Sequence, residues 1–281
     1  MNFFTMIRCI LLGIFVWVRS ASGADDKPQE KPIFSDKKLE AAVRKHVFEK
    51  RDNDKPLTEA DVSNLSTVQA SGYGITNLAG LEKCVALASL DLASNKVSDL
   101  SALKGMNRLQ YLNVSDNQIE SVAPLGQIPA LQYIELSRNR VKDVSALTVL
   151  TNLASLYLSA NQLVELKPVL QLPRLATLYA DHNKVQSIDG IHQLRSLFSL
   201  SLSGNQISDL APLIGLSNMY NLFLENNQIK DLKPLVDLAK SDKSQRFAPF
   251  LNVYLKGNPL SSKAKGEQVG ALKKIGTRIH K

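Results

Sequence analysis

Leu153-x-x-Leu156-x-Leu158-x-x-Asn161 is one copy of a frame that recurs every 22 residues along the middle of this chain. The asparagine that closes the frame returns at Asn95, Asn117, Asn139, Asn161, Asn183, Asn205 and Asn227. A fixed period of this length indicates one supersecondary unit that is stacked many times. The expected fold is an elongated α/β solenoid. Such a fold offers a wide surface rather than a closed catalytic pocket, so the first functional expectation is binding.

Each repeat divides into two halves with different periodicity. Residues 110–114 alternate apolar and polar side chains, as in a half-buried strand. Residues 119–125 space their apolar side chains by three, which favours a 3₁₀ segment or a tight turn over an α-helix. The closing asparagine carries both donors and an acceptor, so we expect it to satisfy buried backbone groups of its own turn and of the adjacent turn. These asparagines are therefore predicted to be structural residues.

Residues 1–24 have the three parts of a secretory signal peptide. Arg8 precedes the apolar stretch 10–18, and small residues follow at 21–24. We expect cleavage after Gly23 or Ala24 and export of the mature chain, which would be periplasmic or secreted. A retained N-terminal anchor is the alternative, although the stretch 10–18 is shorter than the roughly 20 apolar residues of a spanning helix.

The rest of the chain is predicted to form a linker at 25–34, an N-terminal helical cap at 35–64, about nine repeats at 65–260 and a basic helical cap at 261–281. Ser35 is expected to cap the first helix. In the last repeat a polar insertion at 238–249 comes before Phe250, which stands in register with the first leucine of the other frames. Caps with a polar outer face are what a stack of repeats requires for solubility.

Charge is unevenly distributed along the chain. The formal net charge is +8, yet residues 56–239 carry 13 basic and 16 acidic side chains, whereas residues 240–281 carry ten basic and two acidic ones. The basic balance therefore belongs to the C-terminal end and not to the repeats. Cys84 would be the single cysteine of the mature chain, which excludes an intramolecular disulfide. Apolar residues at its equivalent positions in the other repeats predict that Cys84 is buried.

Four segments resemble bacterial internalin-like leucine-rich-repeat proteins with 22-residue repeats. They are Leu57-Thr58-Glu59-Ala60-Asp61-Val62, the segment 74–82, turns such as 205–213, and Lys256-Gly257-Asn258-Pro259-Leu260. The resemblance covers about residues 35–281. It implies a leucine-rich-repeat solenoid with parallel strands on the concave face, 3₁₀ or turn segments on the convex face, helical caps at both ends, and recognition mostly on the concave face.

The polar positions of each strand, which lie one, two, four and six residues before the asparagine, would then point outward from the concave side. Aromatic residues form two columns there, with Tyr111 and Tyr133 in one and Tyr157, Tyr179, Phe223 and Tyr254 in the other. The same face carries Glu135, Arg138, Asp181, His182 and Glu225, together with Asp91, Asp116 and Lys256. We expect Asp116 and Arg138 to pair across strands. Exposed aromatic residues in a row are typical contact anchors, although tyrosine columns also stabilise a sheet by packing.

These features favour an exported, non-enzymatic binding module that recognises a protein or a peptide, or alternatively a glycan, through an aromatic and mildly acidic concave face. Nucleic acid would require a positive groove there. Asp181 and His182 are adjacent, so their side chains diverge and do not suggest a metal or proton-transfer site. Neither catalytic residues nor a cofactor is predicted, and we expect a monomer. The alternative is an envelope-associated structural or glycan-binding protein, held through its basic C-terminal end by an anionic envelope polymer.

Overall fold

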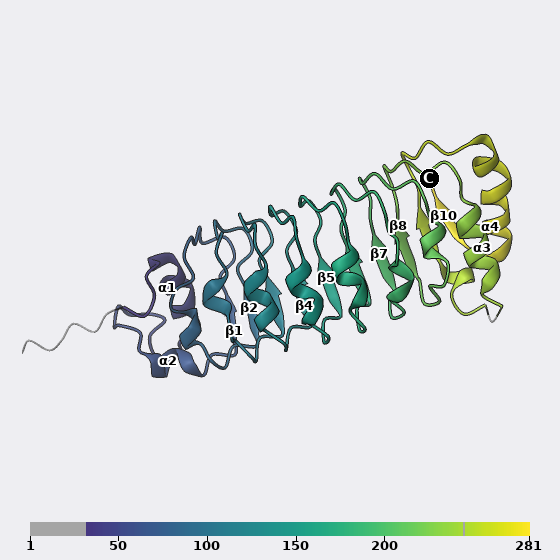
Figure 1. Ribbon diagram of the computed structural model, residues 1–281. Coiled ribbons are helices and arrows are strands. Elements are labelled where there is room, and N and C mark those ends of the chain that lie inside the picture. Colours follow the sequence, from purple (N-terminus) through teal and green to yellow (C-terminus); the bar gives the residue numbers. More distant parts are fainter. Residues whose placement is uncertain (1–31, 244) are drawn as a thin grey trace, which may run out of the picture. The chain divides into compact units, whose positions relative to one another are not determined.

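Short parallel strands of three residues each form one sheet, in which every strand pairs with the next one along the chain, in the order β1 to β10 (Figure 1). The structure is a computed structural model that describes residues 32–243 and 245–281. The predicted signal peptide at 1–24 and residues 25–31 of the predicted linker lie outside the described residues.

The strands are β1 Thr67–Gln69, β2 Ser89–Asp91, β3 Tyr111–Asn113, β4 Tyr133–Glu135, β5 Ser155–Tyr157, β6 Thr177–Tyr179, β7 Ser199–Ser201, β8 Asn221–Phe223, β9 Asn252–Tyr254 and β10 Arg278–His280. The α-helices are α1 Lys37–Arg44, α2 Glu59–Ser63, α3 Lys233–Ser241 and α4 Val269–Ile275. The 3₁₀ turns are η1 Leu81–Lys83, η2 Ser101–Leu103, η3 Ala123–Gln127, η4 Ser145–Val149, η5 Lys167–Gln171, η6 Ile191–Gln193, η7 Ala211–Leu213 and η8 Ala248–Phe250, and η9 Ala264–Gln268 is a π-helical turn.

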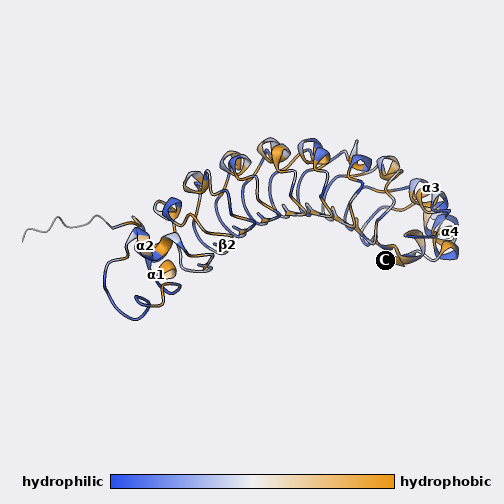
Figure 2. Cartoon of the chain, turned by 90° about the horizontal axis from the view of Figure 1, so that it is seen from below, coloured by the Kyte–Doolittle hydropathy of each residue, from blue (hydrophilic) through white to orange (hydrophobic). Residues whose placement is uncertain are grey.

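The 22-residue period of the sequence becomes the register of the sheet. Leu156 pairs with Ile134 on one side and with Leu178 on the other, and each partner is one period away. Within residues 32–281, Figure 2 shows the strands along the inner side of an arc and the helical turns along its outer side. The predicted leucine-rich-repeat solenoid, with strands on the concave side and 3₁₀ turns on the convex side, is therefore confirmed.

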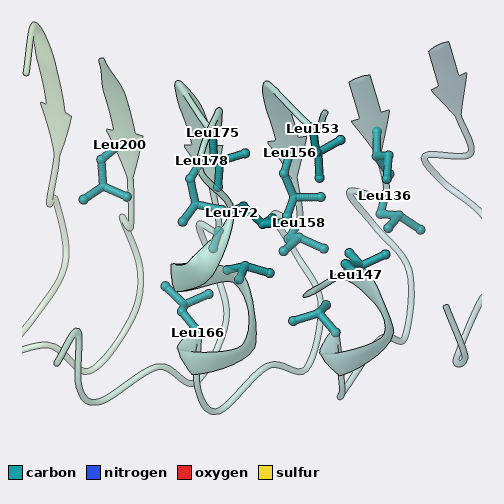
Figure 3. Packing of buried hydrophobic residues seen from close by; sticks show 14 of the residues in the cluster. Leu136, Leu147, Leu153, Leu156, Leu158, Leu166, Leu172, Leu175, Leu178 and Leu200 are labelled. Carbon is teal, nitrogen blue, oxygen red and sulfur yellow. The ribbon is translucent and has the colours of Figure 1, made fainter. Parts of the chain in front are cut away.

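The core is a stack of leucine layers between the strands and the outer turns. Leu156 and Leu158 point inward from the strand side, and Leu147 meets them from η4 (Figure 3). All three side chains are fully buried, and each contributes on the order of 1.5–3 kcal/mol through removal of its apolar surface from water. Cys84 is also fully buried, as predicted, and burial raises the pKa of its thiol to about 12. This cysteine behaves as a small apolar core residue.

The repeated asparagines form a ladder of side chains that bind backbone groups inside the stack. In Asn161, Oδ1 accepts the Val141 N–H at 2.9 Å, and Nδ2 donates to the carbonyls of Leu136 and Leu158 at 3.0 Å. Equivalent bonds are made by every member of this asparagine ladder, which consists of Asn95, Asn117, Asn139, Asn161, Asn183, Asn205, Asn227 and Asn258. The structural assignment of these asparagines is confirmed.

The residue just before each ladder asparagine has a left-handed backbone, which the sequence analysis did not anticipate. Ala160 has φ of 55° and His182 has φ of 52°, whereas Gly204 fills this position with φ of 69°. A left-handed conformation costs a non-glycine residue about 1–2 kcal/mol. The coil accepts this cost because the chain must turn sharply from the strand toward the asparagine ladder.

At the N-terminal end, Asp36 caps helix α1, and the prediction that Ser35 does so is wrong. The Asp36 carboxylate accepts the Lys38 N–H at 2.8 Å inside the helix and the Thr76 N–H at 2.8 Å in the first coil. Although partial burial opposes it, hydrogen bonding from these and the Asn77 amide lowers the pKa of Asp36 to about 2. One carboxylate therefore ties the helical cap to the solenoid. Phe34, from the predicted linker, is buried beside it in the same core.

The C-terminal end differs from prediction in two places. The chain does form helix α4, but residues 278–280 add strand β10 to the sheet instead of continuing a helical cap. Phe250, which stood in register with buried leucines, is 50% exposed, and the next residue, Leu251, is buried in its place. The additional residues at 238–249 allow this change, because they extend α3 and then form the η8 turn ahead of β9. Among the described helices, none is both long and apolar enough to cross a bilayer.

Candidate binding surface

Seven aromatic rings follow one another across the concave face in an unbroken band. Their centroids are 4.5 Å apart between Tyr111 and Tyr133, 5.2 Å between Tyr133 and Tyr157, 5.2 Å between Tyr157 and Tyr179, 6.0 Å between Tyr179 and Phe223, 4.5 Å between Phe223 and Tyr254, and 4.2 Å between Tyr254 and His280. We call these residues the aromatic band. The structure thus brings together every aromatic residue that was predicted for this face and joins the two predicted columns into one.

Small residues in neighbouring strands allow the two columns to join. Tyr133 pairs in register with Ser155, which leaves room for the Tyr133 ring to reach Tyr157 in the other column. Further along, Ser201 stands between Tyr179 and Phe223 in register, and the two rings meet edge to face above it. The small size of Ser155 and Ser201 is therefore needed for the band, because a larger side chain at either position would separate the rings on its two sides.

His280 is the one member of the aromatic band that the sequence analysis missed. It lies in β10, pairs in register with Tyr254 and stacks on its ring with an interplanar angle of 10°. Helix α4 stops at Gly276, whose φ of 102° turns the chain back so that Arg278–His280 can pair with β9. That glycine and the alternation of Arg278, Ile279 and His280 were the available signals in the sequence.

Acidic side chains lie beside the band and are held in place by local hydrogen bonds. The Asp181 carboxylate accepts hydrogen bonds from the Ser159 hydroxyl at 3.0 Å, the Ser203 N–H at 2.7 Å and the Ser201 hydroxyl. The carboxylate of Glu225 accepts the Ser203 hydroxyl at 3.1 Å. In the described part of the chain neither carboxylate is in an ion pair. Their charges are therefore fixed in position and unneutralised.

The expected ion pair between Asp116 and Arg138 is not formed. Asp116 instead accepts a hydrogen bond from the Ser94 hydroxyl at 3.1 Å, and both residues of the expected pair have the left-handed backbone of their position. Ser94, Asp116 and Arg138 occupy equivalent positions in consecutive coils, and Asp116 bonds to Ser94 in the preceding coil and not to Arg138 in the following one. Arg138 and His182 are exposed at the margin of the face, and Glu135 accepts the Ser137 N–H at 2.7 Å.

Tyr111, Tyr133 and Tyr157 are half-buried, and the pKa of each phenol is raised, with burial as the largest cause. Burial raises the pKa of Tyr111, with the nearby Asp91 carboxylate adding to the effect. Burial, the neighbouring phenol groups and Glu135 together raise the pKa of Tyr133 still further. These shifts report a low-dielectric, negative environment, which disfavours a phenolate.

His182 packs against the following coil and does not join Asp181 in a site. A Cβ atom added at Gly204 would lie 2.5 Å from Nδ1 of His182, which shows that the ring covers this glycine. Among the described residues, no three His, Cys, Asp or Glu side chains gather where they could hold a metal ion.

The period, the asparagine ladder and the all-parallel sheet define a leucine-rich-repeat solenoid, and this chain is similar to the internalins, which are leucine-rich-repeat proteins of Listeria monocytogenes. The family model described as leucine-rich repeats (two copies) matches residues 107–149 and 195–237. No curated protein matches the chain in sequence.

Solved structures of similar fold include proteins of two bacteria. Internalin C2 of Listeria monocytogenes is 29% identical with a TM-score of 0.70, and the match covers 82% of this chain and 95% of that one. A leucine-rich-repeat protein of Leptospira interrogans is 28% identical with a TM-score of 0.63, over 73% of this chain and 57% of that one. The internalin InlF of Listeria monocytogenes, at 24% identity and a TM-score of 0.52 over 88% and 91% of the two chains, is similar in fold alone.

Proposed function

We propose that this protein is an exported, non-enzymatic binding module that recognises a protein or peptide through the aromatic band. The unbroken run of seven rings from Tyr111 to His280 is the observation that carries this proposal. Repeat solenoids use their extended concave surfaces for binding. Tyrosines are favoured contact anchors because they combine apolar area with a polar tip and lose little conformational entropy.

The charge beside the band favours a partner segment that carries arginine or lysine. Asp181 and Glu225 hold carboxylates without an ion-pair partner among the described residues, next to the rings of Tyr179 and Phe223. A guanidinium or ammonium group there would meet a carboxylate and an aromatic face together, and both attract a cation. A glycan stacked on the rings would gain the ring contact but not the charge.

Packing alone is the competing explanation for the band, and substitution separates the two. Tyr157→Ser together with Tyr179→Ser should abolish capture of the partner from the native envelope fraction, while the protein stays folded in circular dichroism. The control is Phe48→Ser, which removes an exposed ring of the N-terminal end that belongs to no part of the band. Unchanged capture by the concave variant, with a large loss of stability, would show that the band serves packing.

Electrostatic recognition has its own test in the variant Asp181→Asn with Glu225→Gln. It should lower the association rate and flatten its dependence on salt, because exposed charges steer association and are screened by ions. The isosteric amides leave the rings untouched. An association rate that does not respond to these substitutions or to salt would favour an uncharged partner such as a glycan.

Export is part of the proposal and rests on the pattern at residues 1–24 and on the similarity to internalin C2. The measurement is N-terminal sequencing of the protein from its native source. The mature chain should begin at Ala24 or Asp25 and be recovered outside the cytoplasm. A chain that retains Met1 in the membrane fraction would instead identify an anchor.

The basic C-terminal end supports a second candidate function, which is attachment to an anionic envelope polymer. Lys265, Lys273 and Lys274 are exposed on η9 and α4 and form no ion pair with another described residue. Changing all three to glutamine should release the protein from envelope preparations at low salt. Substitution is preferable to deletion, because removal of α4 and β10 would uncover the buried end of the stack. Retention of the triple variant would argue against this attachment.

A further inference from the structure

We propose that a groove on the flank of the solenoid, outside the concave face, is a second binding site, and that it takes a peptide segment with a bulky apolar side chain next to a carboxylate. The groove has a volume of about 480 Å³ and is lined by Phe198, Met219, Tyr220, Arg246, Phe247 and Phe250, with three small polar residues at its margin. We call it the flank groove. Its volume falls within the range of sites that hold small ligands or peptide side chains.

Phe250 is the first sign that this surface has a role other than packing. At the equivalent position every earlier coil with a ladder asparagine buries a leucine or methionine, whereas Phe250 is 50% exposed. Its orientation is fixed, because the Asp242 carboxylate accepts the N–H groups of Phe247 and Ala248, each at 2.8 Å, at the start of the η8 turn. In this coil a large aromatic side chain therefore lies on the surface, and Leu251 fills the core position instead.

Phe198 and Tyr220 form the opposite wall of the groove. Their rings stack with centroids 5.1 Å apart and an interplanar angle of 4°, and they are 49% and 38% exposed. The equivalent residues of the earlier coils are small or polar, namely Ala88, Gln110, Gln132, Ala154 and Ala176. Large rings thus occur at this position only in the coils that border the groove, and contiguous exposed apolar surface of this kind marks an interaction site.

Charge identifies the chemistry of the partner. Arg246 lines the groove, Arg195 directly precedes the lining residue Ser196, and no acidic side chain contributes to the lining. Neither guanidinium forms an ion pair within residues 32–243 and 245–281. An arginine with free donors recognises a carboxylate through paired hydrogen bonds. The flank groove therefore has the opposite electrostatic preference to the aromatic band.

The test is selection of a displayed random peptide library on the full mature chain. Peptides of the aromatic band are recognised by their loss on Tyr157→Ser with Tyr179→Ser, and the remaining enriched peptides should place an aromatic or large aliphatic residue next to Asp or Glu. Their affinity should fall at least tenfold for Phe250→Ser and for Arg246→Gln, which change exposed side chains and should leave the thermal midpoint nearly unchanged. If the remaining peptides lack acidic residues, or bind both variants as tightly as wild type, the proposal is overturned. A library that yields no peptide sensitive to either variant also overturns it.

Two controls separate this site from the other possibilities. The concave variant Tyr157→Ser with Tyr179→Ser should retain the groove peptides, so failure of one site is distinguishable from failure of the other. Sedimentation of the wild-type protein and of Phe250→Ser should give monomers for both. A wild-type dimer that Phe250→Ser dissociates would show that the groove is an interface between copies of this chain and would overturn the peptide proposal.

Discussion

The asparagine ladder and the aromatic band run through the same coils only a few residues apart, yet their sequences behave differently. The ladder has the same residue in eight coils and is buried or nearly so, and its bonds repeat from one coil to the next. The band changes residue type along its length, shifts from one column to the other between Tyr133 and Tyr157, and is half-exposed. Positions that hold the same residue in every coil are therefore those that the fold requires. Positions whose residue changes from coil to coil are those where the surface can take on another role.

The physical reason is the number of backbone groups that depend on each side chain. Asn161 satisfies one buried N–H and several carbonyls in two consecutive coils, and no other side chain of its size offers both donors and an acceptor in this geometry. Tyr157, by contrast, contributes ring contacts that any neighbouring apolar group could replace in part. Substitutions in the ladder should therefore lower the free energy of unfolding more than substitutions at the surface.

The largest effect is expected for Asn161→Ala. It leaves the Val141 N–H buried without a partner, which costs about 1–3 kcal/mol. It also removes one of the two amide donors of the Leu136 and Leu158 carbonyls, which keep Asn139 and Asn183, at about 0.5–1.5 kcal/mol for each lost bond, so the expected loss in the free energy of unfolding is about 2–5 kcal/mol. Urea denaturation measures it. The matched control Asn152→Ala removes a surface amide that donates to the Pro129 carbonyl at 3.1 Å, and it should cost far less. Equal losses for the two variants would break the distinction between ladder and surface.

A second substitution examines the left-handed position between ladder and band. Gly204→Ala places a Cβ atom 2.5 Å from Nδ1 of His182 and puts alanine at φ of 69°. We expect a loss of about 2 kcal/mol, of which the backbone part is about 1 kcal/mol. In the background His182→Ala only the backbone part should remain, so a double-mutant cycle from thermal unfolding isolates the contact. Strictly additive losses would show that the His182 ring simply moves aside.

The solenoid itself could be predicted from the sequence because its determinants are periodic. Leu156, Asn161 and their equivalents recur at fixed spacing, and a fixed spacing becomes a fixed register in a stack. The columns of aromatic residues followed for the same reason. Their placement on one face does not establish recognition, which stays a prediction until a partner is tested.

Features that depend on a single turn could not be read from the period. The stacking of His280 depends on a turn at Gly276, and the outward Phe250 depends on the η8 turn that ends an insertion found in one coil alone. Periodicity predicts what repeats, whereas these features occur where the repetition ends or bends.

At the N-terminal end of the stack, the stability of the fold should depend on pH through Asp36. Tyr73 takes the ladder position of the first coil, and the Asp36 carboxylate binds the nearby Thr76 and Asn77 N–H groups. An asparagine ladder does not titrate, but Asp36 has its pKa lowered to about 2 from the model-peptide value 3.8. A depressed folded-state pKa means that this stabilisation is complete above about pH 4–5 and is lost as the pH falls toward 2.

Asp36→Asn isolates that effect. At pH 7 it should lower the free energy of unfolding by about 1–2 kcal/mol, a figure reduced from the full linkage value because the carboxylate is partly exposed to solvent. The difference between wild type and variant should shrink as the pH falls below 4 and approach zero only below about pH 2. Asp61 also has a pKa lowered to about 2 and titrates in both proteins, so it cancels in the comparison. A difference that persists unchanged in acid would assign the effect to shape and not to charge.

The smallest expected effect comes from Ala→Gly substitutions, which we compare at a position with a left-handed backbone and at a position without one. Ala160→Gly removes a methyl group at φ of 55°, so relief of the left-handed strain outweighs the entropy that glycine adds to the unfolded chain, and a gain of about 0.5 kcal/mol is expected. Ala154→Gly, at a position without positive φ, should instead lose about 0.5–1 kcal/mol. Opposite signs from the same chemical change would show that the coil prefers glycine just before every ladder asparagine. Side chains that persist there at the margin of the concave face, such as Arg138 and His182, would then be retained against the preference of the fold, which is what a contact surface requires.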